Sequence, residues 1–162
     1  MIYDISQEVF TSRVWPGDPA PAHFIGDGKT IDELNPAAYL GDCCLTHHEG
    51  EVTAADARRI LGYATEADAA QRILIAGKAT VTAEAARVFA DAKIKLIGNE
   101  SQTVGPKNAP MAVHLILLGA DVVLLEGLVL SHVPDGKYLL TAAPIHLGGC
   151  EGAPCRAMLM DL

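Results

Sequence analysis

The chain has 162 residues, of which 50% are hydrophobic and 20% charged, and its formal net charge is −8. This composition excludes a disordered chain and is typical of a globular protein, so we expect a single domain over residues 1–162. Lysine and arginine form no cluster, which argues against nucleic acid or an anionic membrane surface as a partner. No apolar stretch is long enough to span a bilayer and no signal peptide is apparent, so we expect a cytoplasmic protein.

The four cysteines do not form a recognisable pattern. Cys43 and Cys44 are adjacent, and Cys150 and Cys155 complete the set. The absence of a C-x-x-C motif argues against a zinc ribbon and a thioredoxin-type site, and a cytosolic setting keeps thiols reduced. Cys155 is a weak candidate nucleophile because no histidine or other base accompanies it in the sequence.

The first half of the chain predicts a strand, a turn and a helix. Ile2–Ile5 is typical of a short strand, and the prolines of Trp15–Pro21 predict a non-helical turn. A helix is expected from Thr53 to Gly62, with Thr53 as N-cap, Asp56 at the capping-box position and Gly62 as its end.

The second half alternates strands and helices. A buried strand at Arg72–Ala76 is followed by a helix from Thr82 to about Ala92 and a strand at Lys95–Ile97. In that helix four apolar residues at helical spacing should face the sheet, namely Ala85, Val88, Phe89 and Ala92. This order predicts an α/β fold with a mixed, partly parallel sheet and flanking helices.

A long polar loop, Asn99–Pro110, leads into the last part of the chain. A short helix holding His114 should follow, with Leu115 and Leu118 toward the core, and then a strand at Val122–Leu125. The final strands are expected at Tyr138–Ala142 and Ala157–Met160.

Two ionisable residues lie at the ends of apolar segments. His114 opens the apolar run Leu115–Leu118, and Glu126 lies within the hydrophobic stretch Val122–Leu130. A buried carboxylate is costly unless a cation or several hydrogen-bond donors meet it, and imidazole with carboxylate is half of a divalent-metal site. The alternative is purely structural, a core histidine and an edge glutamate, and spacing alone does not decide between the two.

Short motifs spread over nearly the whole chain show a resemblance. In the order in which they occur along the chain, these motifs resemble segments of the cyclase family of metal-dependent hydrolases, the family of kynurenine formamidase and isatin hydrolase. The matching segments are Tyr3–Ser6 with Trp15–Pro19; His23-Phe24 with Asp27–Asp32; Ile97–Ser101 with His114, Leu117-Leu118 and Glu126–Leu128; Ala143–Ile145; and Gly152–Ala157.

The resemblance implies the swivelling β/β/α-like fold of that family, here truncated, and a site that activates water with zinc or manganese. By position, His114 and Glu126 would be metal ligands and His23 the proton-shuttling histidine. Trp15 would lie near the substrate pocket. The implied reaction is hydrolysis of a carbon–nitrogen bond in an aryl formamide or small cyclic amide, a small-molecule substrate.

One family motif is absent. Relatives carry H-x-G-T-H-x-D-A-P before the H-F pair, whereas this chain runs from Pro19 through Ala20, Pro21 and Ala22 to His23. Most ligands of the family site are therefore missing, and Asp18 is a candidate substitute for the motif's carboxylate. Adjacent histidines project in different directions, so His47 and His48 are better explained as a solvated connection than as replacement ligands. Nothing in the spacing of His132 or His146 indicates a metal.

The missing block leaves two further explanations open. The chain could be a catalytically inactive member with a binding or assembly role, or its coding sequence could have lost a block between Asp18 and His23. Loss of a strand would also expose a sheet edge, which predicts a homo-oligomer.

Overall fold

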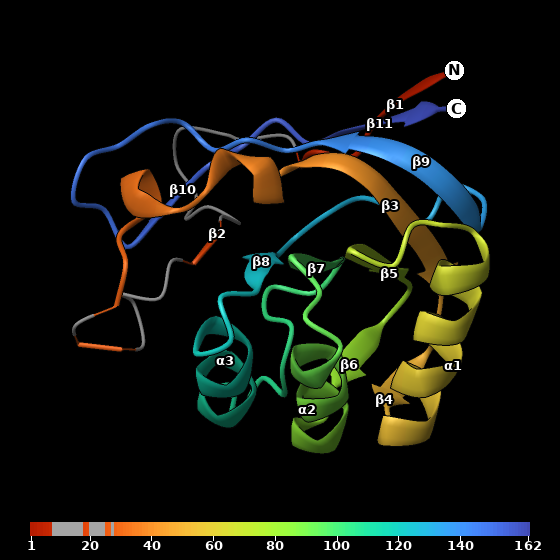
Figure 1. Ribbon diagram of the computed structural model, residues 1–162, viewed down its shortest axis with the longest axis horizontal. Coiled ribbons are helices and arrows are strands. Elements are labelled where there is room, and N and C mark those ends of the chain that lie inside the picture. Colours follow the sequence, from red (N-terminus) through yellow and green to blue (C-terminus); the bar gives the residue numbers. More distant parts are fainter. Residues whose placement is uncertain (8–17, 20–24, 27) are drawn as a thin grey trace.

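A mixed seven-stranded sheet forms the framework of the computed structural model, which describes residues 1–7, 18–19, 25–26 and 28–162 (Figure 1). The strand order is β1-β11-β9-β3-β5-β7-β8. The first four strands pair antiparallel, and β3, β5, β7 and β8 run parallel. The bounds are β1 Ile2–Asp4, β3 Leu40–His47, β5 Arg72–Ala76, β7 Leu96–Asn99, β8 Val123–Leu125, β9 Gly136–Thr141 and β11 Met158–Asp161. The predicted mixed, partly parallel α/β fold is confirmed.

Two small sheets and several helices complete the fold. β2 (Asp18–Pro19) pairs with β10 (Gly152–Ala153), and β4 (Gly50–Val52) pairs with β6 (Ala79–Val81). The α-helices are α1 Ala54–Glu66, α2 Ala83–Asp91 and α3 Met111–Leu118, and two 3₁₀ turns are η2 Ile31–Glu33 and η3 Pro36–Ala38. In the described residues no helix is long and apolar enough to cross a membrane.

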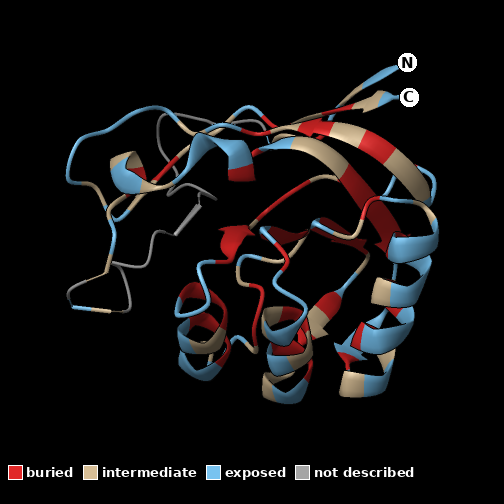
Figure 2. Cartoon of the chain, viewed as in Figure 1, coloured by how far each residue is buried: buried red, intermediate tan, exposed pale blue. Residues whose placement is uncertain are grey.

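The sheet has a hydrophobic core on each face. Helices α1, α2 and α3 cover one face (Figure 1), and the residues coloured as buried in Figure 2 include the parts of these helices that pack in this core. On this helix face, Ile73, Ile75, Ile97 and Leu124 point from the strands to the helices. Leu45, Leu74, Leu96 and Leu125 point to the opposite face, where Ile5, Tyr39 and Leu130 cover them. Successive side chains of each strand therefore pack alternately in the two cores, because side chains along a strand point to opposite faces of the sheet.

The caps of the first two helices follow the sequence. Thr53 accepts a hydrogen bond from Asp56 N–H and the Asp56 carboxylate accepts one from Thr53 N–H, so the predicted capping box is present. The predicted end at Gly62 is wrong, because α1 continues for another turn in which Ala64 is buried. The helix ends where Asp68 adopts a left-handed conformation (φ 53°) and Ala69 N–H bonds to the Ala64 carbonyl.

Two predicted helix faces need correction. Thr82 caps α2 and Ala85 and Phe89 are buried as predicted, but Ala92 is the exposed C-cap residue. In α3, Leu118 is buried whereas Leu115 is 42% exposed. Nearly every residue of α3 is apolar, so the sequence period did not define its buried face.

Strand ends also differ from the predictions. β7 runs on through Gly98 to Asn99, where we expected a loop, and the eight-residue strand β3 was not predicted. Because β3, β5, β7 and β8 are parallel, their carboxyl ends lie along one edge of the sheet. Ligand sites of α/β sheets gather at such an edge.

Candidate functional site

His114 and Glu126 meet at this carboxyl edge, on the helix face of the sheet. Glu126 directly follows β8, and Gly127 after it has a φ of 74°, which turns the chain away from the sheet. His114 lies on α3, where Val113, Leu117 and Leu118 anchor the helix in the core. The imidazole Nε2 and the carboxylate Oε1 are 3.0 Å apart, with side chains only 2% and 10% exposed. The sequence therefore predicted correctly that these two side chains converge.

Each partner also contacts a backbone group. The Pro110 carbonyl oxygen lies 2.9 Å from His114 Nδ1, and Val104 N–H donates to Glu126 Oε1 at 2.7 Å. A carbonyl only accepts, so Nδ1 carries a proton and donates it to Pro110. Nε2 then faces a carboxylate oxygen, and this contact is attractive only if a proton or another cation lies between the two.

The pair fits two ligands of a common metal ion. Two ligands at 2.0–2.1 Å from a tetrahedral ion lie roughly 3.3 Å apart, close to the separation found here. Metal-binding histidines usually donate their second ring N–H to a carbonyl or carboxylate, as His114 does to Pro110. Within the described ranges, however, no group of three His, Cys, Asp or Glu side chains could hold a metal ion. A complete site needs further ligands.

Three predicted site residues cannot be placed as side chains. Trp15 and His23 lie outside the described residues, and for Asp18 only the backbone in β2 is described. Strand β2 packs against β8, the strand that leads to Glu126. The backbone of Asp18 thus passes close to the site.

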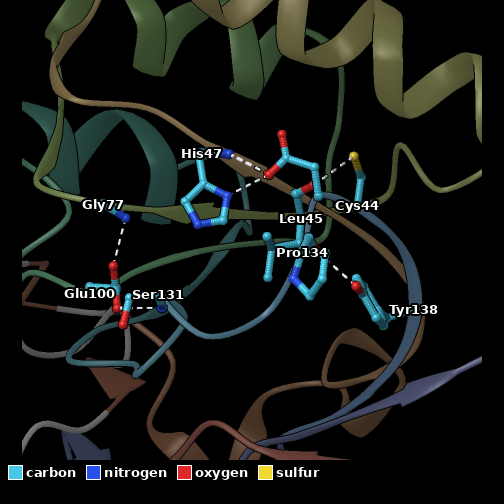
Figure 3. Close-up of polar contacts among 9 residues, drawn as sticks. Cys44, Leu45, His47, Gly77, Glu100, Ser131, Pro134 and Tyr138 are labelled. Atoms are coloured by element: carbon cyan, nitrogen blue, oxygen red, sulfur yellow. Dashed lines mark hydrogen bonds and ion pairs between the residues drawn. The ribbon is translucent and has the colours of Figure 1, made fainter. Parts of the chain in front are cut away.

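A second histidine–carboxylate pair lies at the end of β3 (Figure 3). His47 Nδ1 is 2.5 Å from Asp135 Oδ1, and the same oxygen accepts His47 N–H at 3.0 Å. Both side chains are about half exposed, at 45% and 47%. His48 Nε2 contacts the Glu51 carbonyl oxygen at 3.0 Å instead. The two adjacent histidines have separate partners, but the expected solvated connection is shorter than predicted, because His47 is the last residue of β3 and β4 begins at Gly50.

Glu100 is a polar residue whose role the sequence did not reveal. Its carboxylate accepts hydrogen bonds from Gly77 N–H (2.6 Å), Leu130 N–H (2.8 Å) and Ser131 N–H (3.0 Å), two of them visible in Figure 3. These contacts join the ends of β5 and β7 to the segment after β8. Glu100 therefore fixes the backbone around the site, and its three donors come from residues remote in sequence.

The buried cysteines are not reactive groups. Burial raises the pKa of the Cys43 thiol to about 12 and that of Cys44 to about 11. Without a metal, both thiols are therefore expected to be protonated near neutral pH, which makes them poor nucleophiles.

The sequence is similar to those of bacterial kynurenine formamidases. The enzyme of Erythrobacter litoralis is 30% identical over 159 residues, which cover 88% of this chain and 70% of that protein. The chain belongs to the cyclase family of metal-dependent hydrolases. The resemblance seen in the sequence motifs is therefore confirmed, although no family model matches the chain.

The kynurenine formamidase of Sphingopyxis alaskensis is 27% identical over an alignment of 210 positions, covering 99% of this family member and 98% of the relative. That alignment is longer than the chain, so the relative has residues without a counterpart here.

Solved structures of the family share the fold. One described as a potential metal-dependent hydrolase with cyclase activity superposes with a TM-score of 0.83 at 23% identity, covering 98% of this chain and 96% of that one. Isatin hydrolase A from Labrenzia aggregata superposes with a TM-score of 0.78 at 18% identity, covering 99% of this chain and 93% of that one. The relatives are enzymes named for small-molecule chemistry, so they do not favour the alternative of a non-catalytic binding protein.

Proposed function

We propose that this family member hydrolyses the carbon–nitrogen bond of an aryl formamide or a small cyclic amide with the help of a divalent metal, zinc or manganese. The supporting observation is the buried His114–Glu126 pair at the carboxyl edge of a sheet shared with metal-dependent hydrolases. Burial matters here, because the attraction between a carboxylate and a cation is screened less in the protein interior than in water.

In this proposal the side chains have separate tasks. His114 and Glu126 hold the metal, Asp18 is the candidate third ligand, and Trp15 lines the pocket for the aromatic ring. The chemistry that a bound divalent cation supplies is polarisation of the carbonyl and activation of water. His23 takes a proton from the attacking water and returns it to the leaving nitrogen. Oxygen adds to the carbonyl carbon, the carbon–nitrogen bond breaks, and an acid and an amine result.

The test is hydrolysis of an aryl formamide with and without added Zn²⁺ or Mn²⁺. We expect activity that a chelator abolishes and that His114→Ala and the near-isosteric Glu126→Gln both lose. His47→Ala is the matched control, since it removes the same side chain from a half-exposed pair and should stay active. Activity that persists in chelator, or in both His114 and Glu126 variants, would refute the proposal.

The proton-transfer role of His23 has its own test. His23→Ala should lower kcat by about 10²- to 10⁴-fold, the usual contribution of a general acid–base group, while metal binding is retained. An unchanged kcat in a variant that still binds metal would remove His23 from the scheme.

We also propose a cytoplasmic homo-oligomer. β1 is an edge strand of the large sheet. Its first residue, Ile2, and the preceding Met1 are both exposed. Such edges favour pairing with a second copy. Light scattering at micromolar concentration should give a mass above that of one chain, and a monomer would contradict this.

A further inference from the structure

Two buried oxygens next to the His114–Glu126 pair have no hydrogen-bond partner within the described residues. They are Asn99 Oδ1 and Thr103 Oγ1. Buried polar atoms are almost always paired, and an unpaired one costs free energy unless it serves a ligand. Asn99 is the last residue of β7, and Thr103 lies in the segment after it, next to Val104, whose N–H donates to Glu126.

Asn99 lies beside the segment that carries Glu126. The pairing of β7 with β8 ends at Gly98 and Leu125, and just beyond it Leu128 N–H donates to the Asn99 carbonyl at 3.0 Å. A Cβ on Gly98 would meet Leu74, Leu125 and Leu128 on the face away from the helices. Asn99 follows Gly98, so its side chain points to the opposite face, where α3 carries His114.

The orientation of the Asn99 amide follows from its donors. Its nitrogen Nδ2 lies 3.2 Å from the Ala79 carbonyl and 3.4 Å from the Thr103 carbonyl. Two carbonyl acceptors use both amide protons, which leaves Oδ1 as the free acceptor. The side chain is fully buried, so this oxygen has no access to bulk water.

Among the described residues around the His114–Glu126 pair, more hydrogen-bond acceptors than donors are therefore left unpaired. Besides the two oxygens of Asn99 and Thr103, Glu126 Oε2 takes part in no hydrogen bond with the part of the chain that the structure describes. Carboxylate, amide and hydroxyl oxygens are the donor types that Mn²⁺, Mg²⁺ and Ca²⁺ prefer. A cluster of such oxygens with one imidazole is suited to a cation.

We propose that Asn99 and Thr103 are ligands of the metal that His114 and Glu126 bind, in place of ligands that the absent family motif would supply. This inference rests on the proposed function and deepens it. The site takes a divalent cation of the oxygen-preferring class, for which Mn²⁺ is the probe.

The test measures Mn²⁺ affinity by electron paramagnetic resonance, without any substrate. Asn99→Leu and the near-isosteric Thr103→Val should each weaken Mn²⁺ binding at least tenfold, and Asn99→Asp should retain it. The matched control is Thr46→Val, a buried threonine on β3, two strands away from β7, which should bind like the wild type. Circular dichroism checks that each variant is folded.

The outcomes separate this inference from the proposed function. Wild-type binding that Asn99→Leu and Thr103→Val leave unchanged would overturn the ligand assignment and leave the hydrolase proposal intact. Failure of the wild type to bind Mn²⁺ or Zn²⁺ would overturn both. Should Asn99→Leu not fold, Thr103→Val decides alone, because it removes only the hydroxyl.

Discussion

Two histidine–carboxylate pairs of similar geometry lie in very different surroundings. His114 and Glu126 are 3.0 Å apart and almost fully buried, whereas His47 and Asp135 are 2.5 Å apart and about half exposed. Water screens the exposed pair and solvates either partner alone. The buried pair has lost that solvation, so its charges depend on each other or on a bound cation. Burial, rather than distance, thus marks the functional candidate.

The largest expected effect is the removal of one partner from the buried pair. His114→Ala leaves the Glu126 carboxylate buried with Val104 N–H as its one donor among the described residues, which should cost about 3–5 kcal/mol of unfolding free energy. Urea unfolding of the metal-free protein, followed by circular dichroism, measures this loss. A cost below about 1 kcal/mol would contradict this, because it would show that the buried pair contributes no more to stability than an exposed pair does.

Replacing both buried partners should be less damaging than replacing one. The double variant His114→Leu with Glu126→Met removes both polar groups from the core, and apolar replacements of buried ion pairs are often neutral or stabilising. We expect it to be more stable than His114→Ala in the same urea experiment while losing metal binding. A double variant less stable than either single one would show that the pair stabilises the fold by itself.

Removal of the exposed pair should have a small effect. His47→Ala or Asp135→Asn is expected to cost less than about 1 kcal/mol, and the cost should shrink in high salt, which screens surface charges. Unfolding in low and high salt tests both statements. A cost as large as that of His114→Ala would break the contrast between the two pairs.

A smaller effect is expected at the exposed pair of Asp4 and Arg156. A hydrogen bond from Arg156, aided by Ser6, holds the pKa of Asp4 below its usual value. Because the folded-state pKa is the lower one, the stabilisation is full above the unfolded pKa of about 3.9 and is lost as pH falls through the folded value. Thermal melting of wild type and Arg156→Gln should therefore differ slightly at pH 7 and converge in strong acid. A gap that widens in acid would contradict the sign of the shift.

The sequence predicted local structure well and long-range contacts poorly. Thr53 and Thr82 mark their helices through capping chemistry that spans only three residues, and Ile73–Ala76 in β5 is apolar throughout. Strand β3 escaped prediction because Leu40–His47 mixes acidic, thiol and hydroxyl side chains, and its pairing with β5 and β9 depends on distant residues. Asp135, the partner of His47, is 88 residues away, and no local pattern indicates it.

The same division applies to the site. His114 and Glu126 were found because a polar residue at the end of an apolar segment requires a partner, and their contact is confirmed. Asn99 ends the buried strand β7 in the same way, so this signal was present in the sequence. The roles of the Val104 N–H and the Pro110 carbonyl could not be foreseen, because backbone groups carry no sequence signature.

The most direct test of the account is a crystal soaked with Mn²⁺ and measured for anomalous scattering. We predict a peak in contact with both His114 Nε2 and a Glu126 oxygen, with no such peak at the exposed His47–Asp135 pair. An empty map between His114 and Glu126 at saturating Mn²⁺, with the two side chains still in direct contact, would contradict it.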